Sequence, residues 1–208
     1  MANRPVIPTL RRRRLAVDIL LFLVLLVLLA FLFLSSQTPY LTERQALEGT
    51  QAIYLYGPGD VLTRTETEDT VTYLLQDGDS YALCGLTRRN GPFWSAGGLA
   101  SVVRDRAYPM TVLPTAQYLL VIVNDPNITE VEVLCYDRFR GGFQTLALPQ
   151  STAGDCWLFQ YPDQQSPYKF SSGDFLLRGY DKAGTLVFQS AVPDHWTEQW
   201  DLTIPEAR

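Results

Sequence analysis

The most pronounced pattern in the chain is an unbroken apolar run at Leu15–Leu34. No charged residue occurs between Ile19 and Ser36, and the run is apolar on every side, unlike a helix that buries one face in a soluble core. As a helix, the uncharged part would span roughly 27 Å, close to the ~30 Å hydrocarbon layer of a bilayer. We therefore expect residues 15–36 to be a transmembrane signal anchor in contact with the lipid bilayer.

Four arginines stand directly in front of this run: Arg11, Arg12, Arg13 and Arg14. Residues 1–14 contain five arginines and no acidic residue. Positively charged flanks of membrane helices stay on the cytoplasmic side. We therefore expect residues 1–14 to form a cytoplasmic tail, disordered over residues 1–10. The chain after the anchor would be extracytoplasmic, as in a single-pass protein of the cell membrane.

A cleaved secretory signal peptide is the alternative interpretation of the apolar run. The apolar segment of a signal peptide is about 7–15 residues long and ends in small residues. This run is longer and stays bulky as far as Phe33 and Leu34. Cleavage after Ser35 or Ser36 is the event that this alternative requires.

A short helix is expected in the linker that follows the anchor, residues 37–50. Thr42 and Gln45 have the spacing of a capping box, in which each side chain accepts a hydrogen bond from the other residue's backbone N–H. Gly49 is a natural C-terminal stop for such a helix. We expect Leu41, Ala46 and Leu47 to seat the helix on the domain or on the membrane.

From residue 51 the apolar positions alternate, as in half-buried strands. We expect an N-terminal β module over residues 51–115, with strands at Ala52–Tyr56 and Val61–Thr65. A hairpin joins residues 70–76 to residues 81–86 through Asp77–Gly78, a type I′ turn signal. A turn at residues 89–92 precedes a short strand that starts at Phe93. Residues 96–106 show no clear period and predict a helix or a loop.

A second module is expected at residues 116–192, after a boundary marked by Pro109 and Pro114. Residues 118–123 form a continuous apolar run, YLLVIV, that is too short for most helices and predicts a central strand buried on both faces. Six strands are expected in all, separated by turn signals as in an antiparallel sandwich. Their ranges are 118–123, 129–136, 143–148, 156–161, 174–180 and 185–189.

The end of this module, RGYDKAGTLVFQS at residues 178–190, resembles the last hairpin of bacterial immunoglobulin-like or fibronectin-like domains. In those domains a strand ends in Asp-x-x-Gly before the final strand, as Asp181 and Gly184 do here. The resemblance implies an Ig-like β-sandwich. Antibody domains place two distant cysteines around a tryptophan, whereas Trp157 here follows both Cys135 and Cys156. Only the architecture is therefore carried over, and no site. The expected fold class is mainly β.

The charges of the chain are distributed unevenly. The first 34 residues carry a net charge of +4, and the remainder carries 12 basic and 21 acidic residues, a net charge of −9. An acidic extracytoplasmic part disfavours binding to nucleic acid or to anionic lipid.

Three cysteines follow the anchor: Cys84, Cys135 and Cys156. Disulfides are permitted outside the membrane, and Cys135–Cys156 is the candidate pair because both lie on strand-like segments. The alternative is that all three are buried as small apolar residues.

Two tryptophans, Trp196 and Trp200, lie four residues apart in the tail at residues 193–208, after Asp194 as a candidate N-cap. One interpretation packs both indoles on the sandwich. The other makes them an aromatic interaction surface for a partner or a carbohydrate.

Motifs for catalysis are absent from the sequence. His195 is the only histidine, and no G-x-S-x-G, phosphate-loop or dinucleotide pattern occurs. We expect no catalytic site, cofactor or metal. The leading hypothesis is a binding or scaffolding module of the cell envelope, with another envelope protein or a glycan as partner. The alternatives are a tethered carbohydrate or cell-wall hydrolase that uses carboxylates, and an accessory subunit of a membrane complex.

Overall fold

The computed structural model describes residues 8–37, 40–88, 93–137, 141–148, 151–160 and 175–207. Within these ranges the protein is mainly β, with antiparallel sheets, an N-terminal apolar helix and two short helices. The mainly β fold class is therefore confirmed. Residues 1–7, in the expected tail, and the expected turn at residues 89–92 lie outside the described residues.

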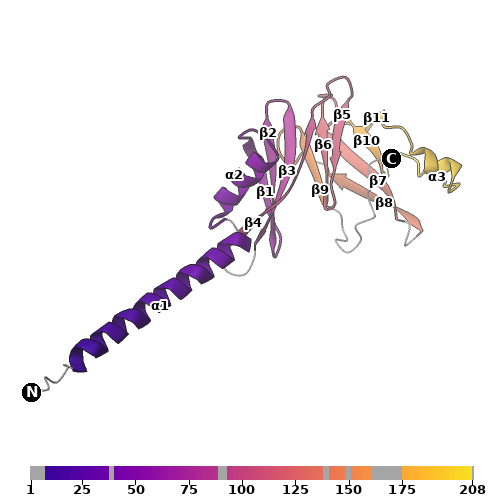
Figure 1. Ribbon diagram of the computed structural model, residues 1–208. Helices are drawn as coiled ribbons and strands as arrows, with labels where there is room; N and C mark the ends of the chain where they lie inside the picture. The colour runs from indigo at the N-terminus through magenta and orange to yellow at the C-terminus, as the bar shows by residue number, and fades with distance from the viewer. Residues whose placement is uncertain are drawn as a thin grey trace, which may run out of the picture.

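The N-terminal helix α1 (Pro8–Gln37) begins seven residues before Leu15, so the expected tail is partly helical. Pro8 is compatible with this start because proline lacks only an N–H that has no partner in the first helical turn. An 18-residue window within Arg13–Leu32 has a mean hydropathy of 3.2, and none of that window is buried. Figure 1 shows α1 projecting from the β domain. The helix is long and apolar enough to cross a membrane.

Helix α2 (Glu43–Ile53) is longer than expected, and the predicted strand at Ala52–Tyr56 is wrong. Thr42 is the N-cap, as predicted, and its hydroxyl accepts from the Gln45 N–H at 3.2 Å. The Gln45 side chain accepts from the Leu41 N–H instead of that of Thr42, so the capping box is incomplete. Leu41 itself stays 51% exposed.

Gly49 does not end helix α2. The ring of Tyr40 lies directly against its Cα, where a Cβ would overlap the ring. Leu55 ends the helix instead, with φ of +54°, and the N–H groups of Leu55 and Tyr56 donate to the carbonyls of Ala52 and Gln51. This is the Schellman pattern, with leucine where glycine is usual.

Sheet A consists of β1 (Asp60–Glu66), β2 (Thr70–Asp77), β3 (Ser80–Arg88) and β4 (Trp94–Val103), in that order. The predicted hairpin of β2 and β3 is confirmed, but its loop is Gly78–Asp79. Of these two residues only Gly78 has positive φ (+59°), which fits a type II′ turn and not type I′. Strand β4 occupies most of the segment that was predicted as a helix or a loop. The sequence did not predict a strand there because its glycines, alanines and serines show no alternation of polarity.

The six strands predicted for residues 118–189 are all confirmed within the described residues, with ends that differ by at most one residue. The predicted end residues 161 and 174 lie outside the described residues. Sheet B has the order β5 (Met110–Pro114), β6 (Tyr118–Val123), β9 (Cys156–Gln160). Sheet C has the order β11 (Leu186–Gln189), β10 (Phe175–Tyr180), β7 (Glu130–Asp137), β8 (Gly142–Leu148). Strand β5 was not expected. The module boundary predicted between residues 115 and 116 falls in the loop that joins β5 to β6 and stays a prediction.

The sheets are stacked as consecutive layers (Figure 1). Helix α2 covers one face of sheet A, and Leu74, Tyr81 and Leu83 on the other face pack against sheet B. The opposite face of sheet B packs against sheet C. Strand β6 has all six residues buried, as its apolar run predicted. Its position between two other sheets is the reason.

The C-terminal segment covers the outer face of sheet C. Helix α3 (Asp194–Glu198) places Trp196 against Leu134 and Leu176, and Leu202 and Ile204 join the same cluster. Pro193 is the N-cap, and Asp194 is the first helical residue, so the predicted cap is displaced by one position.

Candidate functional site

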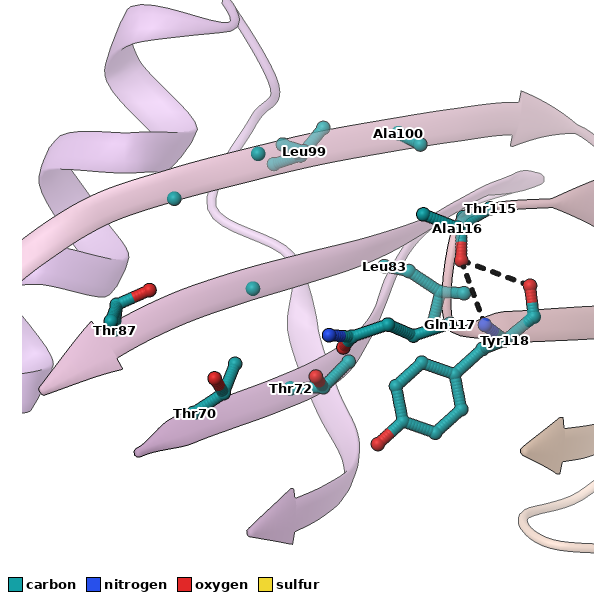
Figure 2. Close-up of a pocket in the computed structure, with 13 residues that line it drawn as sticks. Thr70, Thr72, Leu83, Thr87, Leu99, Ala100, Thr115, Ala116, Gln117 and Tyr118 are labelled. Carbon is teal, nitrogen blue, oxygen red and sulfur yellow. Dashed lines mark hydrogen bonds between the residues drawn. The ribbon is translucent and has the colours of Figure 1, made fainter. Parts of the chain in front are cut away.

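A shallow groove of about 380 Å³ lies between sheet A and the loop that joins β5 to β6 (Figure 2). It opens on the face of sheet A opposite to α2. We call it the threonine groove. Its lining comprises Thr70, Thr72, Leu83, Gly85, Thr87, Gly97, Gly98, Leu99, Ala100, Thr115, Ala116, Gln117 and Tyr118. None of these described lining residues is charged.

Four polar side chains in the groove have unused hydrogen-bonding capacity. Among the described residues, no hydrogen bond involves the hydroxyls of Thr70, Thr72 and Thr87 or the side-chain amide of Gln117. Thr72 is only 6% exposed. Gln117 extends from the loop back over sheet A (Figure 2). Thr70 and Thr87 are half-buried, whereas Gln117 is exposed at the rim. Such groups are available to a ligand or to water.

Thr115 has a different role. Its hydroxyl accepts from the Tyr118 N–H at 3.1 Å and donates to the Tyr118 carbonyl at 2.9 Å. These two bonds close the loop between β5 and β6, and they hold Gln117 at the rim of the groove.

Three glycines form the floor of the groove. The register of β3 against β4 shifts between Cys84 and Leu86, where β4 carries one extra residue, a β-bulge. Gly97 must be glycine, because a Cβ there would overlap the backbone of Gly85. A Cβ on Gly98 would meet no atom within 4 Å, so packing inside the protein does not require glycine there.

A second opening, of about 560 Å³, lies between β5 and the β10–β11 edge of sheet C. Its walls are mostly apolar and include Met110, Val112, Leu177 and Phe188, which belong to the core between sheets B and C or pack against it. Asp194 is the only carboxylate in its described lining. Unlike the threonines of the groove, its polar side chains Gln189 and Ser190 are used inside the protein, where they accept from Arg178 and from the Leu177 N–H.

The charged clusters lie elsewhere and connect elements of the fold. Arg64 of β1 donates to Glu43 of α2 at 2.8 Å and to Glu66 at 2.7 Å. The hydrogen bond from Arg64 lowers the pKa of Glu43. Arg104 pairs with Asp155 at 2.6 Å and donates to the carbonyl of Val123, which ties sheet A to sheet B.

Another ion pair lies under the C-terminal segment. Arg178 of β10 and Glu132 of β7 are 4% and 3% exposed at the side chain and 3.0 Å apart. The same guanidinium donates to the carbonyls of Pro205 and Glu206.

The predicted pair of cysteines is not brought together. Cys135 lies in the core between sheets B and C, whereas Cys156 faces the core between sheets A and B, so sheet B separates them. No disulfide is formed between them. Burial raises the pKa of the Cys84 thiol to about 11 and that of Cys156 to about 12. All three cysteines are buried among apolar side chains, as the alternative interpretation of the sequence expected.

The remaining predicted residues lie apart from the groove. Trp196 is 0% exposed, so it cannot serve as an interaction surface, and Trp200 lies beyond helix α3 against Tyr136 and His195. Arg13 and Arg14 are exposed on α1, and the side chains of Arg11 and Arg12 lie outside the description. The part of the chain that the structure describes contains no cluster of three metal-binding side chains.

A family model described as Domain of unknown function (DUF5044) matches residues 39–200. The chain belongs to this family. The match starts two residues after α1 and takes in α2, all three sheets and α3. The threonine groove therefore lies entirely inside the DUF5044 domain, while α1 lies outside it. No curated protein and no solved structure matches the chain.

The residues of the groove carry little signal in the sequence. Thr70 and Thr72 alternate with apolar residues and could be assigned to the polar face of a strand. Nothing connects them with Gln117, more than forty residues later, until sheet A and the β5–β6 loop are placed side by side. The glycines of β4 can be seen in the sequence, but they interrupt the alternation of apolar and polar residues from which a strand is predicted.

Proposed function

We propose that this DUF5044 protein is a single-pass membrane protein whose extracytoplasmic β domain binds another component of the cell envelope in the threonine groove. The observation that carries the membrane anchor is the exposure of residues 13–32 of α1. An apolar helix that no part of the described protein covers requires another apolar environment, which a bilayer supplies. A short connection, residues 38–42, would keep the DUF5044 domain close to the membrane.

The arginines at the start of α1 support a cytoplasmic N-terminus. Arg11, Arg12, Arg13 and Arg14 would lie at the inner surface under the positive-inside rule. The DUF5044 domain, with its net negative charge, would then lie outside the cytoplasm.

The finer architecture is also a proposal. In immunoglobulin-type domains the strands are lettered in chain order, and β5–β11 would be strands A to G of that scheme. Sheet B then contains the strands A, B and E, and sheet C contains the strands G, F, C and D. Antibody constant domains place the fourth strand with A, B and E. Moving that strand to the other sheet keeps the sandwich, and we infer that sheets B and C form its fibronectin-like variant.

Binding is favoured over hydrolysis by the chemistry of the groove. A hydrolase of the carboxylate type needs two acidic side chains across the scissile bond. The described lining of the threonine groove holds none, and that of the second opening holds one. An accessory subunit is the remaining alternative. It predicts that replacing Leu15–Leu34 by an unrelated apolar helix abolishes function while the domain stays folded.

The test of the proposal is a topology measurement on the full chain with a tag at either end. We expect the chain to stay in the membrane pellet after alkaline carbonate washing. In right-side-out vesicles, protease should remove the C-terminal tag and spare the N-terminal one. Inverted vesicles provide the matched control and should show the reverse. Release by carbonate, or a mature chain that lacks residues 1–36, would contradict the proposal.

A further inference from the structure

We infer that the threonine groove takes a neutral saccharide. The inference rests on the proposed binding function and names the ligand class for the same groove. Its basis is the combination of unpartnered hydroxyl and amide groups, a bare backbone floor and the absence of charge in the described lining.

The polar groups match sugar hydroxyls in kind. A threonine hydroxyl and a glutamine amide each provide both a donor and an acceptor, and so does every hydroxyl of a sugar. Thr70, Thr72 and Thr87 come from two adjacent strands, and Gln117 faces them from the loop (Figure 2). The Thr72 hydroxyl is not among the buried side-chain atoms without a partner, so it keeps access to solvent and a ligand hydroxyl could take the place of its water.

The floor suits a flat ring. Gly85 and Gly98 leave the backbone of β3 and β4 uncovered, so that a ring face can approach it closely. Leu83 and Ala100 add apolar surface for the C–H groups of a sugar. The volume of about 380 Å³ falls in the ~300–1,000 Å³ range of small-molecule sites.

The lack of charge determines which saccharides fit. A sulfated, phosphorylated or uronic saccharide would be desolvated in the groove without a cationic partner. The net charge of −9 after the anchor adds a repulsive long-range field. A peptide that adds to a strand edge would pair with the backbone of β4, the edge strand of sheet A, and would not need the threonine hydroxyls. The threonines, in contrast, project from β2 and β3, the two inner strands of sheet A.

The test is isothermal titration of the full chain, in detergent micelles, with cellohexaose, chitohexaose and maltohexaose at millimolar concentration. Hexagalacturonate serves as the charged comparison and a capped Ala-Gly hexapeptide as the peptide comparison. We expect at least one neutral oligosaccharide to bind and both comparison ligands to fail.

Variants place the binding in the groove. Gly98→Leu puts a side chain into open groove space and should weaken binding at least about tenfold. Gly142→Leu is the matched control, a strand glycine on sheet C with equally open space, and should bind as wild type. Thr70→Val and Gln117→Ala should each weaken binding about 3–10-fold by removing one hydrogen bond.

Three results would overturn the inference. These are binding of the peptide in preference to sugars, no binding of any neutral oligosaccharide, and equal binding by the Gly98→Leu and wild-type chains. Circular dichroism of each variant shows whether a loss reflects misfolding, and Thr70→Val, which keeps the side-chain shape, decides if Gly98→Leu misfolds. If sugars fail while the topology measurement gives the expected result, the saccharide assignment falls and the membrane anchoring stands.

Discussion

At the scale of single residues, the buried pair Arg178–Glu132 shows how the end of the chain is fastened. The guanidinium neutralises Glu132 and also binds the carbonyls of Pro205 and Glu206, so one side chain satisfies both a buried acid and the terminal backbone. Removal of one member of a buried pair leaves an uncompensated charge, which commonly costs about 3–5 kcal/mol.

The variant Arg178→Met is therefore expected to lower the free energy of unfolding by about 3–5 kcal/mol. Adding Glu132→Gln should recover part of this loss, since the buried charge is then absent. The measurement is urea unfolding of the full chain in micelles. Arg44→Met is the control, because Arg44 forms an exposed i,i+4 pair with Glu48 that should contribute little. A loss below ~1 kcal/mol for Arg178→Met would show that the pair is not structurally important.

At the scale of elements, helix α2 has unusual residues at two positions. Gly49 lies inside the helix, where most residues fit the backbone, and Leu55 lies at its left-handed end, where glycine is usual. Gly49 is inside the helix because Tyr40 packs on it, and Leu55 is 93% exposed in a left-handed conformation at the helix end. Helix propensity alone would favour alanine at position 49 by about 1 kcal/mol, so packing and propensity make opposite predictions there.

We expect Gly49→Ala to destabilise the domain, because its Cβ would overlap the Tyr40 ring, and Leu55→Gly to stabilise it by up to about 1 kcal/mol through relief of the left-handed strain. The measurement for both is the midpoint of thermal unfolding. The double variant Gly49→Ala with Tyr40→Leu should recover much of the loss. A stabilising Gly49→Ala would mean that propensity, and not the contact with Tyr40, decides the residue at this position.

At the scale of the whole molecule, sheets A and B share a core and a polar connection. Leu74 and Tyr81 pack with Tyr118 and Ile122, and Arg104 joins the end of β4 to Val123 and Asp155. The DUF5044 match likewise runs through residues 115 and 116 without interruption.

We therefore expect the part outside α1 to unfold in one cooperative transition, with far-UV circular dichroism and tryptophan fluorescence coincident in urea. Arg104→Ala should lower the free energy of unfolding by about 1–3 kcal/mol, and with it the urea midpoint, without separating the two signals. Two resolved transitions, or a stable fragment of residues 116–192, would instead support two independent modules.

Local sequence pattern was sufficient to predict most of the helices and strands of this protein. The apolar run of α1, the cap at Thr42, the hairpin of β2 and β3 and the six later strands follow from hydrophobic periodicity and turn residues, which act between neighbours in the chain. The same rules failed at Ala52–Tyr56 and in β4. There the deciding contacts, Tyr40 on Gly49 and the β3–β4 bulge, are made with segments that local sequence does not specify.

The sequence by itself determined which segments are apolar, which alternate and where turns occur, because these depend on the type and spacing of adjacent residues. Only the tertiary structure decided that Cys135 and Cys156 lie on opposite sides of a sheet, that Trp196 is buried and that three threonines face a glutamine across a groove. Those relations depend on how sheets stack. The stacking of the sheets depends on packing between many side chains that are far apart in the sequence, so it cannot be predicted from any single segment of the chain.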